Sequence, residues 1–360
     1  MKNLKLLSLI IFVASIQGLF GQTKQEQAKE KGKTAVGLED EGKYDDAIKL
    51  LNEAKDLDPE SLVYPYELAY SYYAQKDYKK AISYLEPLTK HKDVIDRVFQ
   101  LLGNSYDDAG DSEKALQIYN DGLKIFPSSG KLYLEEGNVY WGKKEYGKAL
   151  PFYEKGIKVD PAFPSNYFRA SKIYCNSSEE MWGMIYGELF MNLERNSART
   201  KEISKLLYDT YKSQIKFAGD TLTTISFSKN NIINPKDVDK PGGIKIPYSI
   251  IYEPSLAFAV ISEKNIDLNS LDRIRGRFID FYYNKNFDKK YPNVLFEYQK
   301  RVKEAGHMEA YNHWILMMGD ENSFNTWQTS NSDKWTAFVK WFSDNPLKLD
   351  NEHNFYREQY

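Results

Sequence analysis

The residues of this 360-residue chain best suited to catalysis are His307, Glu309 and His313. Imidazole and carboxylate groups bind divalent metals and transfer protons. Glu309 and His313 are four residues apart and share one face of a predicted helix, but His307 and His313 are six apart. Six residues is not the spacing that brings two imidazoles to one metal ion. We expect surface or hydrogen-bonded histidines here, and a metal or acid–base site is the alternative.

Other catalytic patterns in the sequence are incomplete. The single cysteine, Cys175, has no histidine close to it in the sequence, so we expect it to be a packing residue. Gly242 and Gly243 follow Pro241 without the Lys-Ser or Lys-Thr that completes a phosphate-binding loop. We therefore predict no catalytic residue, no metal and no cofactor. A hydrolase-like or metal-dependent enzyme with its site in the C-terminal region remains the rival hypothesis.

The charge of the chain argues against a nucleic-acid partner. Its 49 basic and 51 acidic residues give a formal net charge of -2 and are interspersed along the sequence. Nucleic acids and anionic lipids attract blocks of basic residues, and the sequence contains no such block. With 42% hydrophobic residues, the chain can bury a full core. We expect a folded protein that does not bind nucleic acid.

The N-terminus has the pattern of a secretory signal peptide. Lys2 and Lys5 precede an apolar run from Leu6 to Ile16, and small and polar residues follow up to Gln22. No later segment approaches the roughly 18 apolar residues that a membrane-spanning helix needs. We predict that residues 1–21 are removed and that the protein is exported, periplasmic or extracellular, with no integral membrane segment.

The elements that must position any site form a repeat. Ala47, Ala81, Ala115 and Ala149 are 34 residues apart, and two further columns of residues keep the same register. A period of this length, with small residues where two backbones must approach, indicates stacked pairs of antiparallel helices. The small column is Ala35, Ala69, Gly103, Gly137 and Ser171, and the bulky column three residues later is Leu38, Tyr72, Tyr106, Tyr140 and Tyr174.

These columns resemble those of the tetratricopeptide-repeat (TPR) family over residues 28–195. The resemblance implies an α-solenoid of about four to five helix pairs, in which the first helix of each pair lines a concave groove for a peptide or protein. The lysine that begins the chaperone-tail clamp of some family members is replaced by Gln100, so we do not expect that partner. Mapped onto this sequence, the groove residues are Tyr66, Tyr70, Tyr73, Gln100, Asn104, Asp107, Leu134, Asn138, Trp141, Phe168, Arg169 and Lys172.

The periodicity ends after residue 217. Residues 196–217 are interpreted as a capping helix, and residues 218–360 as a smaller α-rich domain with a short β element. Within this domain we expect strand and loop over 220–243, a strand over 248–261, and helices over 271–283, 294–305, 309–318 and 335–342. We predict an exported scaffold or adaptor that binds a peptide or protein partner. A structural component of a cell-envelope complex is a further alternative.

Overall fold

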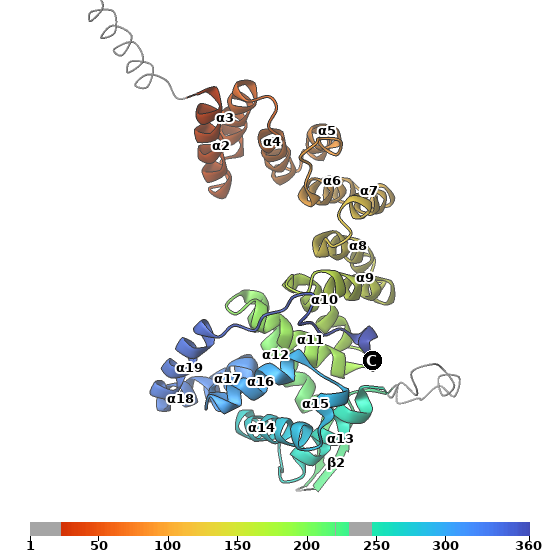
Figure 1. Cartoon of the computed structure of the whole chain (residues 1–360), viewed down its shortest axis with the longest axis vertical. Coiled ribbons are helices and arrows are strands. Elements are labelled where there is room, and N and C mark those ends of the chain that lie inside the picture. Colours follow the sequence, from red (N-terminus) through yellow and green to blue (C-terminus); the bar gives the residue numbers. More distant parts are fainter. Residues whose placement is uncertain (1–22, 220, 230–246) are drawn as a thin grey trace, which may run out of the picture. The chain divides into compact units, whose positions relative to one another are not determined.

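The computed structural model describes residues 23–219, 221–229 and 247–360, and the predicted signal peptide over 1–21 lies outside these residues. The described part of the chain is mostly helical, with one two-stranded sheet (Figure 1). No helix in it is long and apolar enough to cross a membrane. The chain divides between Phe126 and Pro127 into two compact units, which are described separately.

The first unit consists of three helix pairs. Each pair joins a first helix to a second by a short turn, and the two helices pack along each other. Small side chains allow this approach, because a Cβ atom added to Gly103 would lie 2.1 Å from the Tyr119 ring of the paired helix. The pairs are α2 (Lys24–Asp40) with α3 (Tyr44–Leu57), α4 (Val63–Ala74) with α5 (Tyr78–Leu88), and α6 (Asp96–Asp108) with α7 (Ser112–Ile125).

The turn inside four of the helix pairs uses the same backbone conformation. Gly42, Lys76, Gly110 and Lys144 all have a positive φ, between 60° and 96°, and they recur every 34 residues. Glycine adopts this left-handed conformation readily, whereas lysine does so at a cost. The repeat therefore imposes the turn even where the residue type disfavours it.

The second unit begins with two more helix pairs: α8 (Gly130–Gly142) with α9 (Tyr146–Val159), and α10 (Pro164–Tyr174) with α11 (Glu180–Leu193). The prediction of an α-solenoid of about four to five helix pairs is thus confirmed. α11 differs from the second helices before it, because residues 180–192 are all buried. A Cβ atom on Gly183 would lie 2.5 Å from the backbone nitrogen of Cys175, so this glycine lets α11 approach α10 closely.

The rest of the second unit is α-rich, as expected. α12 (Ala198–Gln214) ends before the predicted residue 217, because Ile215–Ala218 (β1) pairs antiparallel with Thr221–Ile225 (β2). Beside the four expected helices, three were not predicted: α13 (Ser249–Val260), α15 (Phe287–Lys290) and α18 (Glu321–Ser330). The helices that follow the hairpin are α13 (Ser249–Val260), α14 (Leu268–Asn284), α15 (Phe287–Lys290), α16 (Val294–Glu304), α17 (Met308–Leu316), α18 (Glu321–Ser330) and α19 (Ser332–Asp344), with short 3-10 turns at Met317–Gly319 (η2) and Arg357–Gln359 (η3).

The expectation of a strand over 248–261 was wrong, because this segment is helix α13. Its β-branched and aromatic residues favour a strand. Its buried residues, however, include Tyr252, Leu256 and Ala259, which recur at helical spacing and pack toward α14. Packing on one face of the helix therefore outweighs the strand propensity of the individual residues.

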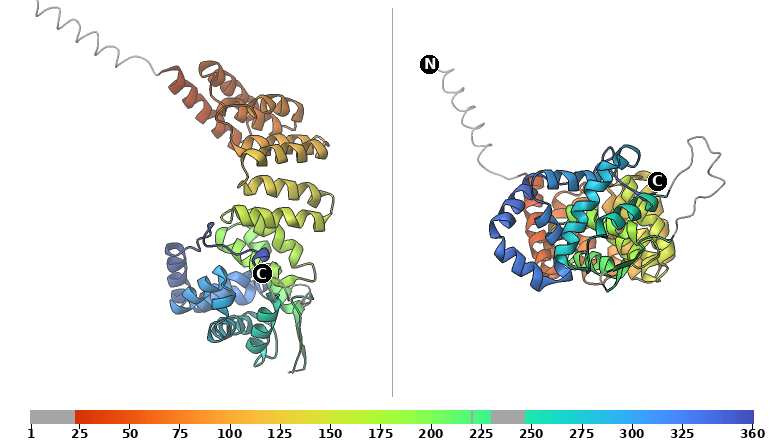
Figure 2. Two further views of the ribbon diagram at one scale, coloured as in Figure 1. Left: turned by 45° about the vertical axis from the view of Figure 1, so that its right-hand side comes forward. Right: turned by 90° about the horizontal axis from the view of Figure 1, so that it is seen from below.

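One hydrophobic core in the second unit includes residues from Leu134 to Phe355. It joins the last two helix pairs to the C-terminal helices. The last residues of the chain belong to this core and lie beside the same helix pairs (Figure 2). Arg357 donates to both carboxylate oxygens of Glu154 on α9, at 2.7 and 2.8 Å, and Phe355 is fully buried.

Candidate binding surfaces

The first helices of the fourth and fifth pairs bring five of the predicted groove residues onto one surface, which we call the α8–α10 face: Asn138, Trp141, Phe168, Arg169 and Lys172. The guanidinium carbon of Arg169 lies 4.7 Å from the centre of the Trp141 ring, and Lys172 Nζ lies 5.6 Å from it. Asn138 lies one turn before Trp141 on α8. Because cations are attracted to the faces of aromatic rings, Trp141 and the two cations form a preorganised cluster.

Arg169 is the cation of this cluster that is free to meet a partner. Lys172 Nζ forms an ion pair with Glu202 at 2.5 Å. Arg169 forms no ion pair or hydrogen bond with any residue that the structure describes, and its side chain is half-buried. The Trp141 ring is itself held edge-on against Tyr146, with 5.0 Å between ring centres. The face therefore presents unused guanidinium donors on a fixed aromatic ring.

Other predicted groove residues are used within the chain. Leu134 and Phe168 are only 9% and 6% exposed, so they contribute mainly to packing. The amide of Asn138 is satisfied at both ends, because its oxygen accepts from Tyr153 at 3.1 Å and its nitrogen donates to Glu135 at 2.8 Å. We expected this amide to bind a peptide backbone, and the structure places its hydrogen bonds inside the helix pair.

The remaining predicted residues lie in the first unit and form the α4–α6 face: Tyr66, Tyr70, Tyr73, Gln100, Asn104 and Asp107. Tyr70 is the most open, at 41% exposed. The others are partly buried, and Asn104 accepts from the Tyr119 hydroxyl at 2.6 Å, as Asn138 does from Tyr153. Tyr73 donates to Asp108 at 2.5 Å. Burial raises the pKa of Tyr66 to about 12, so this hydroxyl stays neutral.

Buried carboxyl groups are features of the repeats that sequence reasoning missed. Burial, and secondly the nearby Glu39, raise the pKa of Glu67 on α4 to about 7. On α8, Glu136 is 2% exposed, and burial raises its pKa to about 7 as well. The residues 34 and 68 positions earlier, Leu102 and Leu68, are fully buried. A carboxyl group at a leucine position of the repeat was the signal available in the sequence.

Comparison with known protein families decides what the repeat is. A family model described as tetratricopeptide repeat matches residues 38–105, and a second matches residues 96–129 and 130–163. Residues 38–163 are tetratricopeptide repeats. The TPR repeats form a scaffold for protein interaction. The α8–α10 face combines α8, which lies within the matched residues, with α10, which begins directly after them.

Several solved structures match about half of the chain. A thermophilic TPR protein of Thermus thermophilus is 17% identical and matches 50% of this chain and 98% of its own, with a TM-score of 0.42. PilF of Pseudomonas aeruginosa is 18% identical over 53% of this chain and 86% of its own, at 0.44. YrrB, described as a TPR protein with an unusual peptide-binding site, is 15% identical over 52% of this chain and 94% of its own, at 0.33. No curated protein matches the chain.

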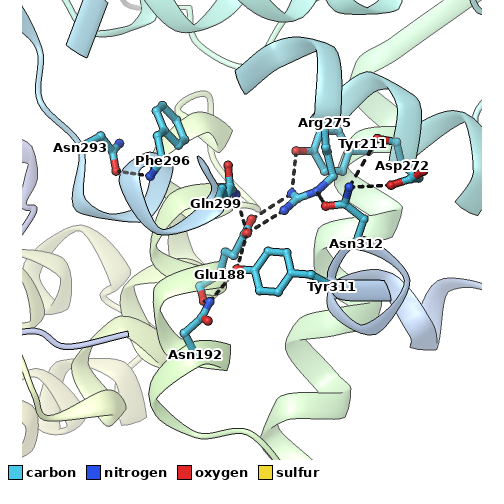
Figure 3. A network of polar contacts seen from close by, with 10 residues as sticks. All are labelled: Glu188, Asn192, Tyr211, Asp272, Arg275, Asn293, Phe296, Gln299, Tyr311 and Asn312. Atoms are coloured by element: carbon cyan, nitrogen blue, oxygen red, sulfur yellow. Dashed lines mark hydrogen bonds and ion pairs between the residues drawn. The ribbon is translucent and has the colours of Figure 1, made fainter. Parts of the chain in front are cut away.

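Beyond the matched TPR repeats, the second unit contains a buried polar network that sequence reasoning did not find (Figure 3). Glu188 on α11 accepts from both terminal nitrogens of Arg275 on α14, at 2.6 and 2.9 Å, and both side chains are about 5% exposed. Gln299 on α16 and Tyr311 on α17 also donate to Glu188, at 2.5 and 2.8 Å. Burial alone would lower the pKa of Arg275, but the Glu188 carboxylate raises it above its ordinary value.

The network joins the fifth helix pair to the C-terminal helices and has the properties of a structural contact. The cavity beside Glu188 and Arg275 has a volume of about 20 Å³, which is enough for a single water molecule and too small for a substrate. A lone glutamate within the otherwise apolar segment from Met181 to Met191 was the signal for it. Removing one member of such a pair leaves an unpaired buried charge.

His307 and His313, the two histidines of the candidate catalytic cluster, have different surroundings. His313 stacks on Trp327 with 4.1 Å between ring centres, and its Nδ1 lies 2.8 Å from the backbone oxygen of Glu309. The His307 ring lies beside Trp341, and burial lowers its pKa. The Glu309 carboxylate accepts from Trp327 at 2.8 Å and from Lys334. Within residues 23–219, 221–229 and 247–360, no three histidine, cysteine or acidic residues are grouped to hold a metal ion.

Proposed function

We propose that this protein is an exported scaffold that binds a peptide or protein partner on the α8–α10 face. The observation that supports the proposal is the stacking of the Arg169 guanidinium on Trp141, with its hydrogen-bond donors left unused by the described residues. Tryptophan and arginine are the residues most enriched at the energetic centres of protein interfaces. A guanidinium on a fixed ring loses little side-chain freedom on binding, so more of the contact energy is available for affinity.

The partner is first identified by affinity capture from an envelope extract, and binding is then measured with purified proteins. Trp141→Ala together with Arg169→Ala should weaken binding by about 2 kcal/mol or more, as truncation of central interface residues commonly does. The matched control is Phe152→Ala together with Lys148→Ala, which removes an aromatic ring and a cation from the second helix of the same repeat. Melting temperatures of both variants show whether folding is intact.

The control variant also separates this proposal from its rival. If the α9 substitutions abolish binding and the α8–α10 substitutions leave it unchanged, the chain acts as a structural component of an envelope complex through its second helices. Equal binding by both variants and the parent would place the partner elsewhere on the chain and refute the proposal for this face.

Export is a separate part of the proposal and rests on the N-terminal pattern of lysines followed by an apolar run. N-terminal sequencing of protein taken from the source cells should find a chain that starts near Gln22, in a fraction outside the cytoplasm. A chain that retains Met1 in the cytosolic fraction would refute export and would leave the binding proposal standing.

A further inference from the structure

Helix α13 exposes apolar side chains along one face. We call this the α13 stripe: Ile250, Pro254, Ala257, Phe258 and Ile261. Ile250, Phe258 and Ile261 are 38%, 52% and 72% exposed, although the opposite face of the same helix is buried. The spacing of four, three, one and three residues aligns the five on one side of an α-helix. A helix that is apolar on both sides, with one side open, marks a contact surface.

The stripe carries no charge of its own and continues onto the next helix. Glu253 is the only acidic residue between positions 250 and 261. It accepts hydrogen bonds from the backbone nitrogens of Phe227 and Ser228, at 2.6 and 2.8 Å. Phe258 stacks on Phe281 of α14 with 4.5 Å between ring centres. The ammonium of Lys285 lies 5.5 Å from the centre of the Phe281 ring. An apolar surface with a long cation laid along its edge is the arrangement that lysine adopts at lipid interfaces.

The rim of the stripe carries two arginines that share one buried carboxylate. Glu263 follows the end of α13 and pairs with Arg273 at 2.6 Å and with Arg277 at 2.5 Å. The carboxylate side chain is 5% exposed, whereas the two arginine side chains are 52% and 31% exposed. Lys264, which follows Glu263 in the sequence, is also exposed. These cations are scattered in the sequence and become a cluster only through the fold.

We propose that the α13 stripe and its cationic rim bind an anionic membrane surface peripherally. Apolar side chains that enter the interface, beside cations that attract anionic headgroups, are the two parts of such binding. The two most exposed side chains, Phe258 and Ile261, lie at the end of the helix and outside the hollow that Ile250, Pro254 and Ala257 line with Ile225. Exposed side chains outside a groove suit a bilayer better than a helical peptide. A second copy would place one cationic rim against another, and like charges oppose that contact.

Vesicle sedimentation tests the proposal, with a chain that starts at Gln22 so that the apolar run from Leu6 to Ile16 is absent. The parent should bind vesicles of phosphatidylcholine with phosphatidylglycerol and should bind pure phosphatidylcholine at least tenfold more weakly. Binding should fall as salt is raised, because the headgroup attraction is screened. Failure to bind the anionic vesicles, or equal binding to both kinds, would overturn the proposal.

Variants assign the binding to this surface. Phe258→Ser together with Ile261→Ser should lower binding to the anionic vesicles about tenfold or more. Val339→Ser, on α19 and 46% exposed, is the matched control and should bind as the parent does. Ile261→Ser alone, at the most exposed position, provides a second test that leaves the stacked rings in place. If the double variant binds vesicles normally and loses a protein partner, the stripe is a protein-docking surface and the lipid proposal is wrong.

Discussion

Replacing Glu136 should stabilise the second unit by an amount that depends on pH. The side chain is 2% exposed, and burial raises its pKa from 4.5 to about 7. A rise of about 2.5 pH units corresponds to about 3 kcal/mol, at about 1.4 kcal/mol per unit. Leucine occupies the same repeat position at 68 and 102, so Glu136→Leu suits the core as well as removing the carboxyl group.

The sign of the pH dependence follows from where the proton is bound. Below about pH 4.5 the carboxyl group is protonated in both the folded and the unfolded chain, and the burial of its charge costs nothing. Between about 4.5 and 7 only the unfolded chain loses the proton, so stability falls as pH rises. Above about 7 the full loss of about 3 kcal/mol is present. Glu136→Leu and Glu136→Gln should both lack this fall.

Guanidinium denaturation followed by tryptophan fluorescence measures this difference. All 6 tryptophans lie in the second unit, so the signal reports the unit that contains Glu136. Comparing each variant with the parent at the same pH removes the contribution of the other titrating groups to the difference in stability. Glu136→Leu should exceed the parent by about 3 kcal/mol more at pH 8 than at pH 4.5. A difference in stability that is the same at both pH values would refute the argument, because it would mean that Glu136 is ionised in the folded protein.

Three further outcomes follow from close packing and burial. Gly137→Leu should lower the free energy of unfolding by about 1–3 kcal/mol in the same denaturation experiment, because a Cβ atom there would lie 2.3 Å from the Tyr153 ring. Gly147→Leu is the control and should lower it less, because no atom lies within 4 Å of a Cβ atom at that position. Arg275→Met should lower the free energy of unfolding by about 3–5 kcal/mol, because it leaves the buried Glu188 unpaired. Adding Glu188→Leu should recover part of that loss. If the effects of the two substitutions on stability simply added, the result would contradict this coupling. Burial raises the pKa of the Cys175 thiol to about 12. Iodoacetamide should therefore label it slowly in the native protein at pH 8 and quickly in denaturant. Rapid labelling of the native protein would contradict this prediction.

The helix pairs could be predicted from the sequence because their packing repeats at a fixed spacing. Ala47 and its equivalents are fully buried where the period of 34 places them. Lys76 and Lys144 show that the repeat position predicts the backbone better than the residue type does, because lysine rarely adopts their left-handed conformation. The stacking of Arg169 on Trp141 was also within reach, because both residues belong to first helices of adjacent pairs.

The C-terminal region could be predicted only in outline, because its contacts join residues that are far apart in sequence. Glu188 and Arg275 are separated by 87 residues, and no local pattern connects them. The segment that forms α13 combined strand-favouring residue types with a helical spacing, and only the packing against α14 resolves the two. The hydrogen bond from the Tyr153 hydroxyl to Asn138 could not be read from the sequence, because the two residues lie on different helices.

The contact between Arg357 and Glu154 has a consequence for how the chain folds during synthesis. The two residues are 203 positions apart, and the bond closes across the whole second unit. The first unit ends at Phe126, so all of its residues have been synthesised once the third helix pair is complete. Glu154, by contrast, is complete long before its arginine exists, and domains generally fold as units in order of synthesis. Synthesis therefore completes the residues of the first unit well before the segment that closes the core of the fourth and fifth pairs.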